Sequence, residues 1–283
     1  MRPPAARMSV RRLCVLAAAL FMLPLGRAEA ADMVSYRARY ALSLDSSQTS
    51  SGVVGAGGVI VDQWNATCTG WTEEEHYYLH LDYGGEDRGH DRDTLDTYSS
   101  FVSWESLDAR HFQFDLRQAE TDTPYEEIKG EASLDGPGKG GTAQFSRPGE
   151  SVLPLPAGTV FPAAHTRFLI ASAEAGDQLV TRQVFDGSEV AGATQITAVI
   201  GPKLRPGALK ARSRLPKSPL LNRPSWRVRL AFFPPDRNSE LPDYEESVRL
   251  LDNGVIAEML FDYGDYAVRA RLTHIEALHR PPC

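Results

Sequence analysis

Cysteines are the residues in this sequence whose chemistry is easiest to predict. Cys14 lies in an apolar N-terminal segment, whereas Cys68 and Cys283 lie in the rest of the chain. Two cysteines remaining in an exported protein are typical of a single disulfide. A bond between Cys68 and Cys283 would enclose about 216 residues, counted from position 68 to position 283. The chain-entropy model assigns so long a loop a stabilisation of roughly 5 kcal/mol.

The N-terminal segment has the pattern of a secretory signal peptide. Basic residues, including Arg11-Arg12, precede an apolar run from Leu13 to Leu25, and Ala28-Glu29-Ala30 is a small-x-small cleavage site. The run is shorter than the about 20 residues of a membrane-spanning helix. We predict a signal peptide over residues 1–30, cleaved after about Ala30, and Sec export as a soluble protein to a Gram-negative periplasm. The arginine pair leaves the twin-arginine route open.

The predicted mature chain is acidic. Removal of residues 1–30 takes away five arginines and one glutamate, which leaves 25 basic and 36 acidic residues and a net charge of −11. Binding to phosphate groups needs a basic surface, so this charge argues against nucleic acid as a partner. About 250 residues can bury most of their apolar surface in one core. We therefore predict a single domain over residues 31–283.

No motif predicts a metal site or a cofactor. His76 and His80 lie on one predicted strand, about 13 Å apart, which is too far to share a metal. His274 and His279 lack the HExxH spacing. The acidic segment 86–93 could attract calcium, but it lacks the ligand spacing of an EF-hand, and we interpret it as a polar hairpin tip. We interpret all the histidines as ordinary surface or core residues: His76, His80, His90, His111, His165, His274 and His279.

The sequence also lacks a catalytic motif. Glu73-Glu74-Glu75 and Glu126-Glu127 alternate between strand faces, which argues against catalytic pairing; a retaining glycosidase needs two carboxyls about 5 Å apart. Neither Gly-x-Ser-x-Gly nor Ser-x-x-Lys is present. The glycines of segment 55–58 lie among strand residues and indicate a bulge or a close backbone approach, not a phosphate loop. We predict a protein without enzymatic activity. The alternative is a periplasmic hydrolase that acts on envelope glycan or lipid.

Strands account for most of the predicted structure. Apolar and polar residues alternate in segments 34–44, 76–83, 112–116, 226–230 and 266–275, as in half-buried antiparallel strands. Such runs predict roughly twelve to fourteen strands in a sandwich or barrel. Asn253-Gly254 predicts a two-residue type I′ hairpin turn, which needs a positive φ at both positions. Most aromatic residues should lie in the core, although a coiled sheet could also leave an apolar cavity for an acyl chain or a peptide.

Two segments depart from the strand pattern. Segment 162–175 is rich in alanine, begins with Pro162 and precedes Gly176, which predicts one helix that plugs or flanks the sheet. Segment 202–224 holds five prolines and seven lysines and arginines without an acidic residue. We interpret it as a solvated, mobile connection. A contact with anionic lipid head groups, lipopolysaccharide or an acidic partner is the alternative.

Over nearly the whole predicted mature chain, the sequence resembles the EipB cell-envelope integrity proteins of α-proteobacteria. The resemblance depends on short motifs spread along the chain, together with Cys68 and the terminal Cys283. The motifs are Tyr40-Ala41-Leu42-Ser43-Leu44, Ser51-Gly52-Val53, the segment from Leu155 to His165, Val184-Phe185-Asp186-Gly187-Ser188, Ser225-Trp226, Tyr244-Glu245-Glu246-Ser247, Leu251-Asp252-Asn253-Gly254-Val255, Asp262-Tyr263-Gly264-Asp265-Tyr266 and Ile275-Glu276-Ala277-Leu278.

The resemblance implies a mostly β fold. A long antiparallel sheet would coil into a spiral or open barrel around one main helix, as in the lipoprotein carriers LolA and LolB, with a disulfide between Cys68 and Cys283. The last strand would then end near the segment after Trp64, so that the two ends of the sheet meet. The resemblance also implies a periplasmic monomer linked to outer-membrane integrity, with a TPR-repeat protein as candidate partner and a lipid or lipoprotein as candidate ligand. The family has no established catalytic site, and the loop 202–224 looks longer than the family leads us to expect.

Overall fold

The computed structural model describes residues 33–47, 51–84, 94–208, 215–235 and 240–283. The predicted signal peptide, the acidic segment 86–93 with His90, and the middle of the basic loop lie outside the described residues. In the described part, fifteen strands and one α-helix form the fold, and the strands belong to one sheet. The strands are β1 (Tyr36–Ser47), β2 (Val53–Ala66), β3 (Gly70–Tyr83), β4 (Thr94–Ser106), β5 (His111–Glu120), β6 (Glu126–Leu134), β7 (Gly141–Arg147), β8 (Ser151–Leu155), β9 (Thr159–Val160), β10 (Leu179–Val184), β11 (Thr194–Ile200), β12 (Ser225–Phe233), β13 (Tyr244–Leu251), β14 (Ile256–Asp262) and β15 (Tyr266–Ala277).

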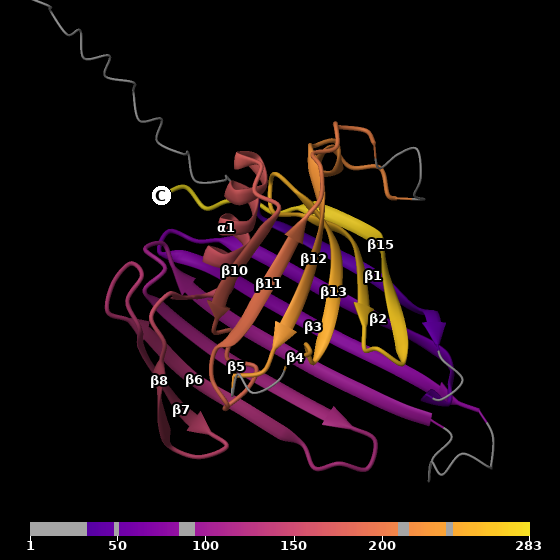
Figure 1. Ribbon diagram of the computed structural model, residues 1–283, viewed down its shortest axis with the longest axis horizontal. Coiled ribbons are helices and arrows are strands. Elements are labelled where there is room, and N and C mark those ends of the chain that lie inside the picture. The colour runs from indigo at the N-terminus through magenta and orange to yellow at the C-terminus, as the bar shows by residue number, and fades with distance from the viewer. Residues whose placement is uncertain (1–32, 48–50, 85–93, 209–214, 236–239) are drawn as a thin grey trace, which may run out of the picture.

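The sheet coils into a nearly closed barrel, which confirms the predicted fold class (Figure 1). Its strand order is β8-β7-β6-β5-β4-β3-β2-β1-β15-β14-β13-β12-β11-β10-β9. Neighbouring strands are antiparallel except for β9 and β10. Strand β1 lies between β2 and β15, and Tyr36 is paired with Trp64 on one side and Ala277 on the other. The start and end of the predicted mature chain are therefore neighbours, as expected.

A disulfide joins Cys68, in the turn between β2 and β3, to Cys283. The two Cα atoms are 5.5 Å apart. The bond connects the segment that follows β15 to the β2–β3 turn, beside the place where β1 and β15 pair. It thus fastens the C-terminal segment at one end of the barrel, near the pairing of the first and last strands of the chain.

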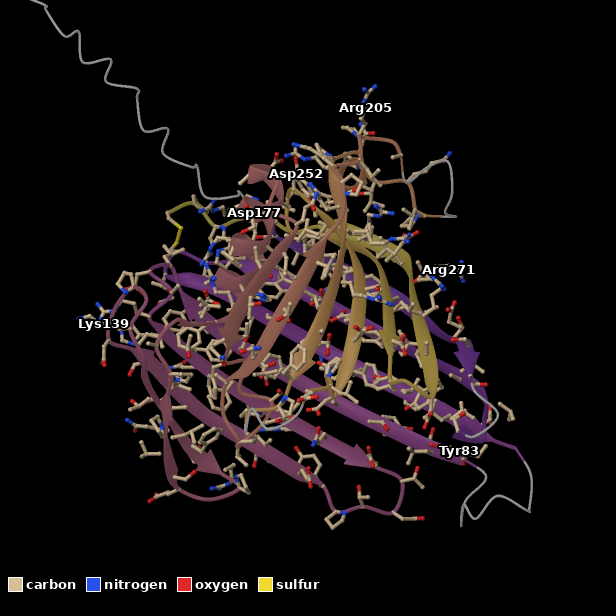
Figure 2. All side chains as sticks on the ribbon, in the orientation of Figure 1. Tyr83, Lys139, Asp177, Arg205, Asp252 and Arg271 are labelled. Atoms are coloured by element: carbon tan, nitrogen blue, oxygen red, sulfur yellow. A yellow bond between two sulfur atoms is a disulfide. The ribbon has the colours of Figure 1, made fainter. Side chains whose placement is uncertain are left out.

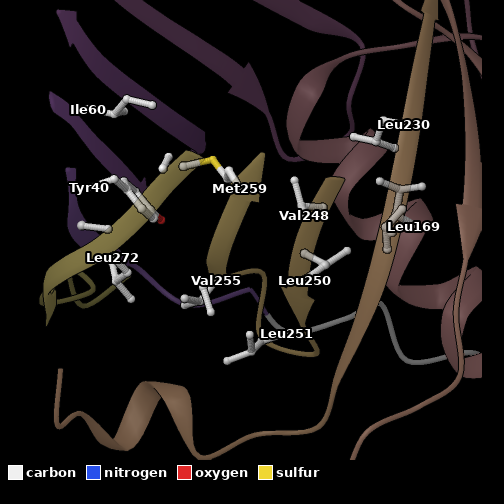
Figure 3. Close-up of a cluster of buried hydrophobic side chains, with 14 of the residues drawn as sticks. Tyr40, Ile60, Leu169, Leu230, Val248, Leu250, Leu251, Val255, Met259 and Leu272 are labelled. Carbon is white, nitrogen blue, oxygen red and sulfur yellow. The ribbon is translucent and has the colours of Figure 1, made fainter. Parts of the chain in front are cut away.

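Helix α1 (Pro162–Ala175) has the bounds that the sequence predicts. Gly176 ends it in the left-handed conformation, with φ 87°, which glycine adopts without a steric penalty. Leu169 and Ile170 project from the helix into the main hydrophobic core. That core extends over the inner face of β1 and β12–β15, where Tyr40, Met259 and Leu272 pack together (Figure 3). None of the helices among the described residues has the length and apolar character needed to cross a membrane.

A second, aromatic core lies under strands β5–β8. Its rings are in mutual contact: Phe112 stacks on Phe161 with centroids 5.0 Å apart, and Phe114 meets Phe145 and Phe185 edge to face at 5.5 Å. Edge-to-face and offset arrangements of this kind add to the stabilisation that burial alone provides. The two cores occupy different parts of the interior.

Three details differ from the sequence predictions. The sheet has fifteen strands rather than twelve to fourteen, because β8 and β9 have five and two residues, too few to show alternation. The hairpin at Asn253-Gly254 is present, but its loop has three residues, because Gly254 N donates to Leu251 O (3.0 Å) and Leu251 N to Val255 O (2.9 Å). Only Gly254 has a positive φ in this loop; Asn253 is buried and donates to Leu220 O.

The third difference concerns the basic loop 202–224. One end of it is anchored to the barrel: Leu221, in the 3-10 helix η2 (Pro219–Leu221), is buried in the main core, whereas the other described residues of the loop are exposed or half-buried, as a solvated connection requires. Lys203 pairs with Glu174 on α1, and Arg223 pairs with Asp252 at 2.7 Å. The described part of the loop covers the helix end of the barrel, where Figure 2 places Arg205.

Candidate functional site

Four carboxylates from distant parts of the sequence lie on the inner face of the coiled sheet: Asp62 on β2, Glu73 and Glu75 on β3, and Glu246 on β13. Alternate residues of a strand share a face, so Glu73 and Glu75 both point inward, while Glu74 is exposed on the outer face. Coiling of the sheet brings β13 towards β3, and Glu246 therefore interacts with Glu75 across the interior.

Glu73 and Glu75 lie on one face and interact, although the sequence argument from alternating faces treated them as separated; that they do not pair as catalytic carboxylates stays a prediction. The argument from alternation separates Glu74 from its neighbours, but it places residues i and i+2 on the same face. The same spacing was therefore the signal that could have found half of this site. Glu126 and Glu127 do point to opposite faces: Glu127 pairs with Arg117 and Arg147, and Glu126 accepts from Gln118.

Asp62 and Glu75 are directly opposed in the β2–β3 ladder. Two like charges in opposed positions destabilise a strand pair. The Tyr36 hydroxyl donates to Oδ2 of Asp62 at 3.1 Å, whereas Oδ1 has no hydrogen-bond partner in the described structure. Asp62 is only 8% exposed. A neutral carboxyl removes the repulsion and is less costly to bury, so the arrangement favours a protonated Asp62.

The pKa values of these groups shift in one direction. Burial raises the pKa of Asp62 to about 8, and the neighbouring charge of Glu75 adds to the shift. Burial also raises the pKa of Glu75 and of Glu246 to about 7, and that of Glu73 well above its usual range. At pH 7 Asp62 is therefore mostly protonated, whereas Glu75 and Glu246 are protonated in about half of the molecules; a protonated carboxyl can donate a hydrogen bond.

Aromatic rings surround the carboxylates. Phe232 stacks on Tyr244 with ring centroids 4.3 Å apart. Tyr244 also stacks on Tyr263 at 6.2 Å, and Tyr263 stacks on Tyr266 at 5.0 Å. Tyr77, from the strand that carries Glu73 and Glu75, interacts with the Tyr263 hydroxyl. The result is a continuous row of rings with hydroxyl groups at one side of the carboxyl cluster, an amphipathic surface suited to a ligand with apolar and polar parts.

Other side chains cover this part of the inner face only partly. Glu73, Glu75, Tyr77 and Glu246 are half-buried, and Tyr263 is 39% exposed, although burial dominates the pKa shift of each. A side chain can be partly exposed and still have a pKa shifted by burial when protein atoms lie around it but do not contact all of its surface. The inner face between the two cores thus keeps surface that a small ligand or water can contact.

Glu105 is a fifth inward carboxylate with a structural role. It accepts hydrogen bonds from the backbone N–H groups of Ala163 (2.7 Å) and Ala164 (2.9 Å), the first turn of α1, and pairs with Arg167 at 3.3 Å. The N-cap residue Phe161 provides no side-chain cap. A strand residue far away in the sequence therefore caps the helix. Burial raises the pKa of Glu105 to about 7 despite these partners.

The histidines are dispersed, and among the described residues no group of three or more His, Cys, Asp or Glu side chains could hold a metal ion. His165 is buried in α1, and burial lowers its pKa to about 4. His80 lies on the outer face, where its ring nitrogens contact Asp96 (2.8 Å) and Asp82 (3.1 Å). Hydrogen bonds to these carboxylates, to Asp96 first, raise the pKa of His80.

Known proteins resemble this chain over most of its length. The family model of the EipB-like proteins matches residues 27–279. The cell envelope integrity protein EipB of Brucella abortus (strain 2308) is 29% identical over 255 residues, which cover 88% of this chain and 86% of the relative. A crystal structure of a β-barrel-like protein from Brucella abortus, described as a domain of unknown function, superposes with a TM-score of 0.73 at 26% identity. The match covers 87% of this chain and 99% of that structure.

Proposed function

Because the chain belongs to the EipB-like family, we propose that it is a periplasmic protein without enzymatic activity that supports the integrity of the cell envelope. The Brucella relative is named as a cell envelope integrity protein. The signal-peptide pattern of residues 1–30 and the disulfide between Cys68 and Cys283 support the compartment, because structural disulfides persist in oxidising compartments.

The protein would act by holding an amphipathic ligand against its inner face. One observation carries this step: the surface between the two cores combines an accessible row of aromatic rings with carboxyls whose raised pKa values keep them partly protonated at neutral pH. Apolar chains would pack on the rings of Tyr244 and Tyr263, and polar head atoms would accept hydrogen bonds from Glu75 and Glu246. A lipid or lipoprotein has this chemistry. A TPR-repeat partner and a monomeric state, which the family resemblance implies, belong to the same proposal.

Native mass spectrometry of protein purified from the periplasm tests the ligand. We expect a copurifying lipid mass with the wild type and its loss with the double variant Tyr244→Ala and Glu246→Gln. Tyr98→Ala, which removes a ring from the outer face, is the matched control and should keep the ligand. A wild-type spectrum without adduct, or equal loss in the control, contradicts ligand binding at the inner face.

Gene deletion tests the envelope role. Cells without the protein should become sensitive to detergents and to antibiotics that act on the cell wall. Wild-type protein should restore tolerance, and the double variant at Tyr244 and Glu246 should not. Unchanged tolerance after deletion contradicts the envelope role, whereas restoration by the double variant contradicts only the part assigned to the inner face.

A hydrolase is the second candidate, because converging carboxylates with raised pKa values are typical of catalytic sites. A general acid and a general base or nucleophile require environments that push their pKa values apart. Here burial raises the pKa of Asp62, Glu73, Glu75 and Glu246 alike, which favours binding over acid–base catalysis. Hydrolysis of envelope glycan or lipid by the wild type, and its loss in Glu75→Gln, would reverse this choice.

A further inference from the structure

A straight row of side chains crosses the outer face of six neighbouring strands. Each member is paired in register with the next, so the row runs perpendicular to the strands, and at about 4.8 Å per strand it is about 24 Å long. We call it the outer row. It consists of Thr72 (β3), Trp104 (β4), Gln113 (β5), Glu131 (β6), Gln144 (β7) and Val152 (β8).

The outer row lies in a groove. A hollow of 780 Å³ is lined by all six members. An adjoining hollow of 300 Å³ shares four of them, Trp104, Gln113, Glu131 and Gln144. Strand β7 has a bulge at Ser146, opposite Lys129 and Gly130 of β6, under this groove, and a bulge bends its strand. A Cβ atom at Gly130 would lie 2.2 Å from the backbone oxygen of Gln144, so the close approach of β6 to β7 beside the bulge requires a glycine.

The groove combines a flat ring with polar side chains that make no hydrogen bond to another described residue. Trp104 is half-buried, and Gln113, Glu131 and Gln144 are exposed. Within the described residues, the side chains of these three have no protein partner. An indole packs against the apolar C–H face of a pyranose ring. Amide and carboxylate groups match the donors and acceptors of sugar hydroxyl and N-acetyl groups. The strand spacing is close to the spacing of successive hexoses in a linear glycan.

Charge selects among saccharides. The residues that line the groove include three acids, Asp115, Glu131 and Glu150, and one base, Lys129. Asp115 pairs with Lys129 at 3.1 Å, which leaves Glu131 and Glu150 to set the sign of the field. A negative groove repels phosphorylated saccharides and accepts uncharged ones.

We propose that the outer row binds a neutral, linear strand of N-acetylated hexosamines. The indole of Trp104 would stack on one sugar, and Gln113, Glu131 and Gln144 would each hydrogen-bond to the sugar that crosses their strand. The site lies on the opposite face of the sheet from the carboxyl cluster and does not depend on the ligand proposed for the inner face. A protein with both sites could contact lipid material and the cell-wall glycan at the same time.

Calorimetric titration of the mature protein with chitin oligosaccharides tests the length and chemistry of the site. Affinity should rise from the disaccharide to the hexasaccharide as more of the row is filled. Gln113→Ala and Gln144→Ala should each weaken hexasaccharide binding about threefold to tenfold, the equivalent of one hydrogen bond. Trp104→Ala should weaken it further. Because Gln113 and Gln144 are exposed, their variants fold even if Trp104→Ala does not.

Matched controls separate the row from the rest of the outer face. Tyr98, on strand β4, is 54% exposed, and Tyr125, just before β6, is 59% exposed. Both rings lie outside the groove, so Tyr98→Ala and Tyr125→Ala should bind the hexasaccharide as the wild type does. Cosedimentation with purified cell-wall sacculi should follow the same order of variants. The proposal is overturned if the wild type binds neither chitohexaose nor sacculi. It is also overturned if the control variants weaken binding as much as the variants of the outer row do. Binding only to a phosphorylated lipopolysaccharide saccharide overturns it as well.

Discussion

Conformational stability should decrease as pH rises above 6.5, because carboxyls of the inner face must ionise in a buried site. The pKa of Asp62 is about 8 in the folded protein and near 3.8 without the burial; for Glu75 and Glu246 the values are about 7 and 4.5. In this range the folded state binds more protons than the unfolded state, so the free energy of unfolding falls with pH. The contribution of each group is fully present below its unfolded pKa and is lost through its folded pKa.

The magnitude follows from Asp62, which is nearly inaccessible to solvent at 8% exposure. While Asp62 is protonated in the folded state and ionised in the unfolded state, each rise of one pH unit lowers the free energy of unfolding by about 1.4 kcal/mol. From pH 6.5 to pH 8 the free energy of unfolding should therefore fall by about 2 kcal/mol. His165 has the opposite sign, since burial lowers its pKa to about 4, but most of its effect lies below pH 6.5 and only about 0.4 kcal/mol remains above it. Glu105 and His80, whose pKa values are raised, add to the fall.

Urea unfolding at intervals of half a pH unit, followed by tryptophan fluorescence with the disulfide intact, measures the effect. Asp62→Asn keeps the shape and cannot ionise, so it should make the fall with pH clearly smaller and be more stable than the wild type at pH 8; the remaining fall comes from Glu75 and Glu246. Asp115→Asn, an acid on the outer face, should leave the slope unchanged. A wild-type stability that is constant or rises between pH 6.5 and 8 refutes the reasoning, as does a slope in Asp62→Asn equal to that of the wild type.

Three further substitutions have expected outcomes. Glu105→Ala leaves two helix N–H groups and Arg167 without their partner, so it should cost about 3–5 kcal/mol in urea unfolding; a loss below about 1 kcal/mol contradicts the cap. Cys68→Ser and Cys283→Ser should each lower the melting temperature by several degrees without further loss in the double variant, whereas additive losses would mean that the thiols are not partners. Gly130→Ala should lower the melting temperature and weaken chitohexaose binding; wild-type values for both would show that the close approach of β6 to β7 at Gly130 is not required.

Local patterns in the sequence predict most elements of this fold. Alternation finds the long strands, and Pro162 and Gly176 delimit the helix, since both signals depend on neighbouring residues alone. Helix capping could not be predicted, because the cap, Glu105, comes from a strand and meets the helix only after the sheet coils. The turn at Asn253 depends likewise on a buried contact with Leu220, which overrides the local preference for a type I′ turn.

The carboxyl cluster shows the same limit. Glu73 and Glu75 share a face by spacing alone, and this much was available from the sequence. Asp62 joins them through the β2–β3 register, which depends on a hairpin of two fourteen-residue strands. Glu246 joins them only because the sheet closes on itself and brings β13 towards β3. A contact is harder to predict from a local sequence pattern when the strands that bring the two residues together are farther apart in the sequence.

Strand β4 connects the outer row to the capping of helix α1. Trp104 points outward into the groove, and the next residue, Glu105, points inward to the helix N-terminus. A shift of one residue in the register of β4 would exchange the two faces. It would bury the indole's position and expose the helix cap. The contact between Glu105 and α1 therefore fixes the register that presents Trp104, and a variant that weakens this contact should also weaken glycan binding, although Glu105 itself never faces the groove.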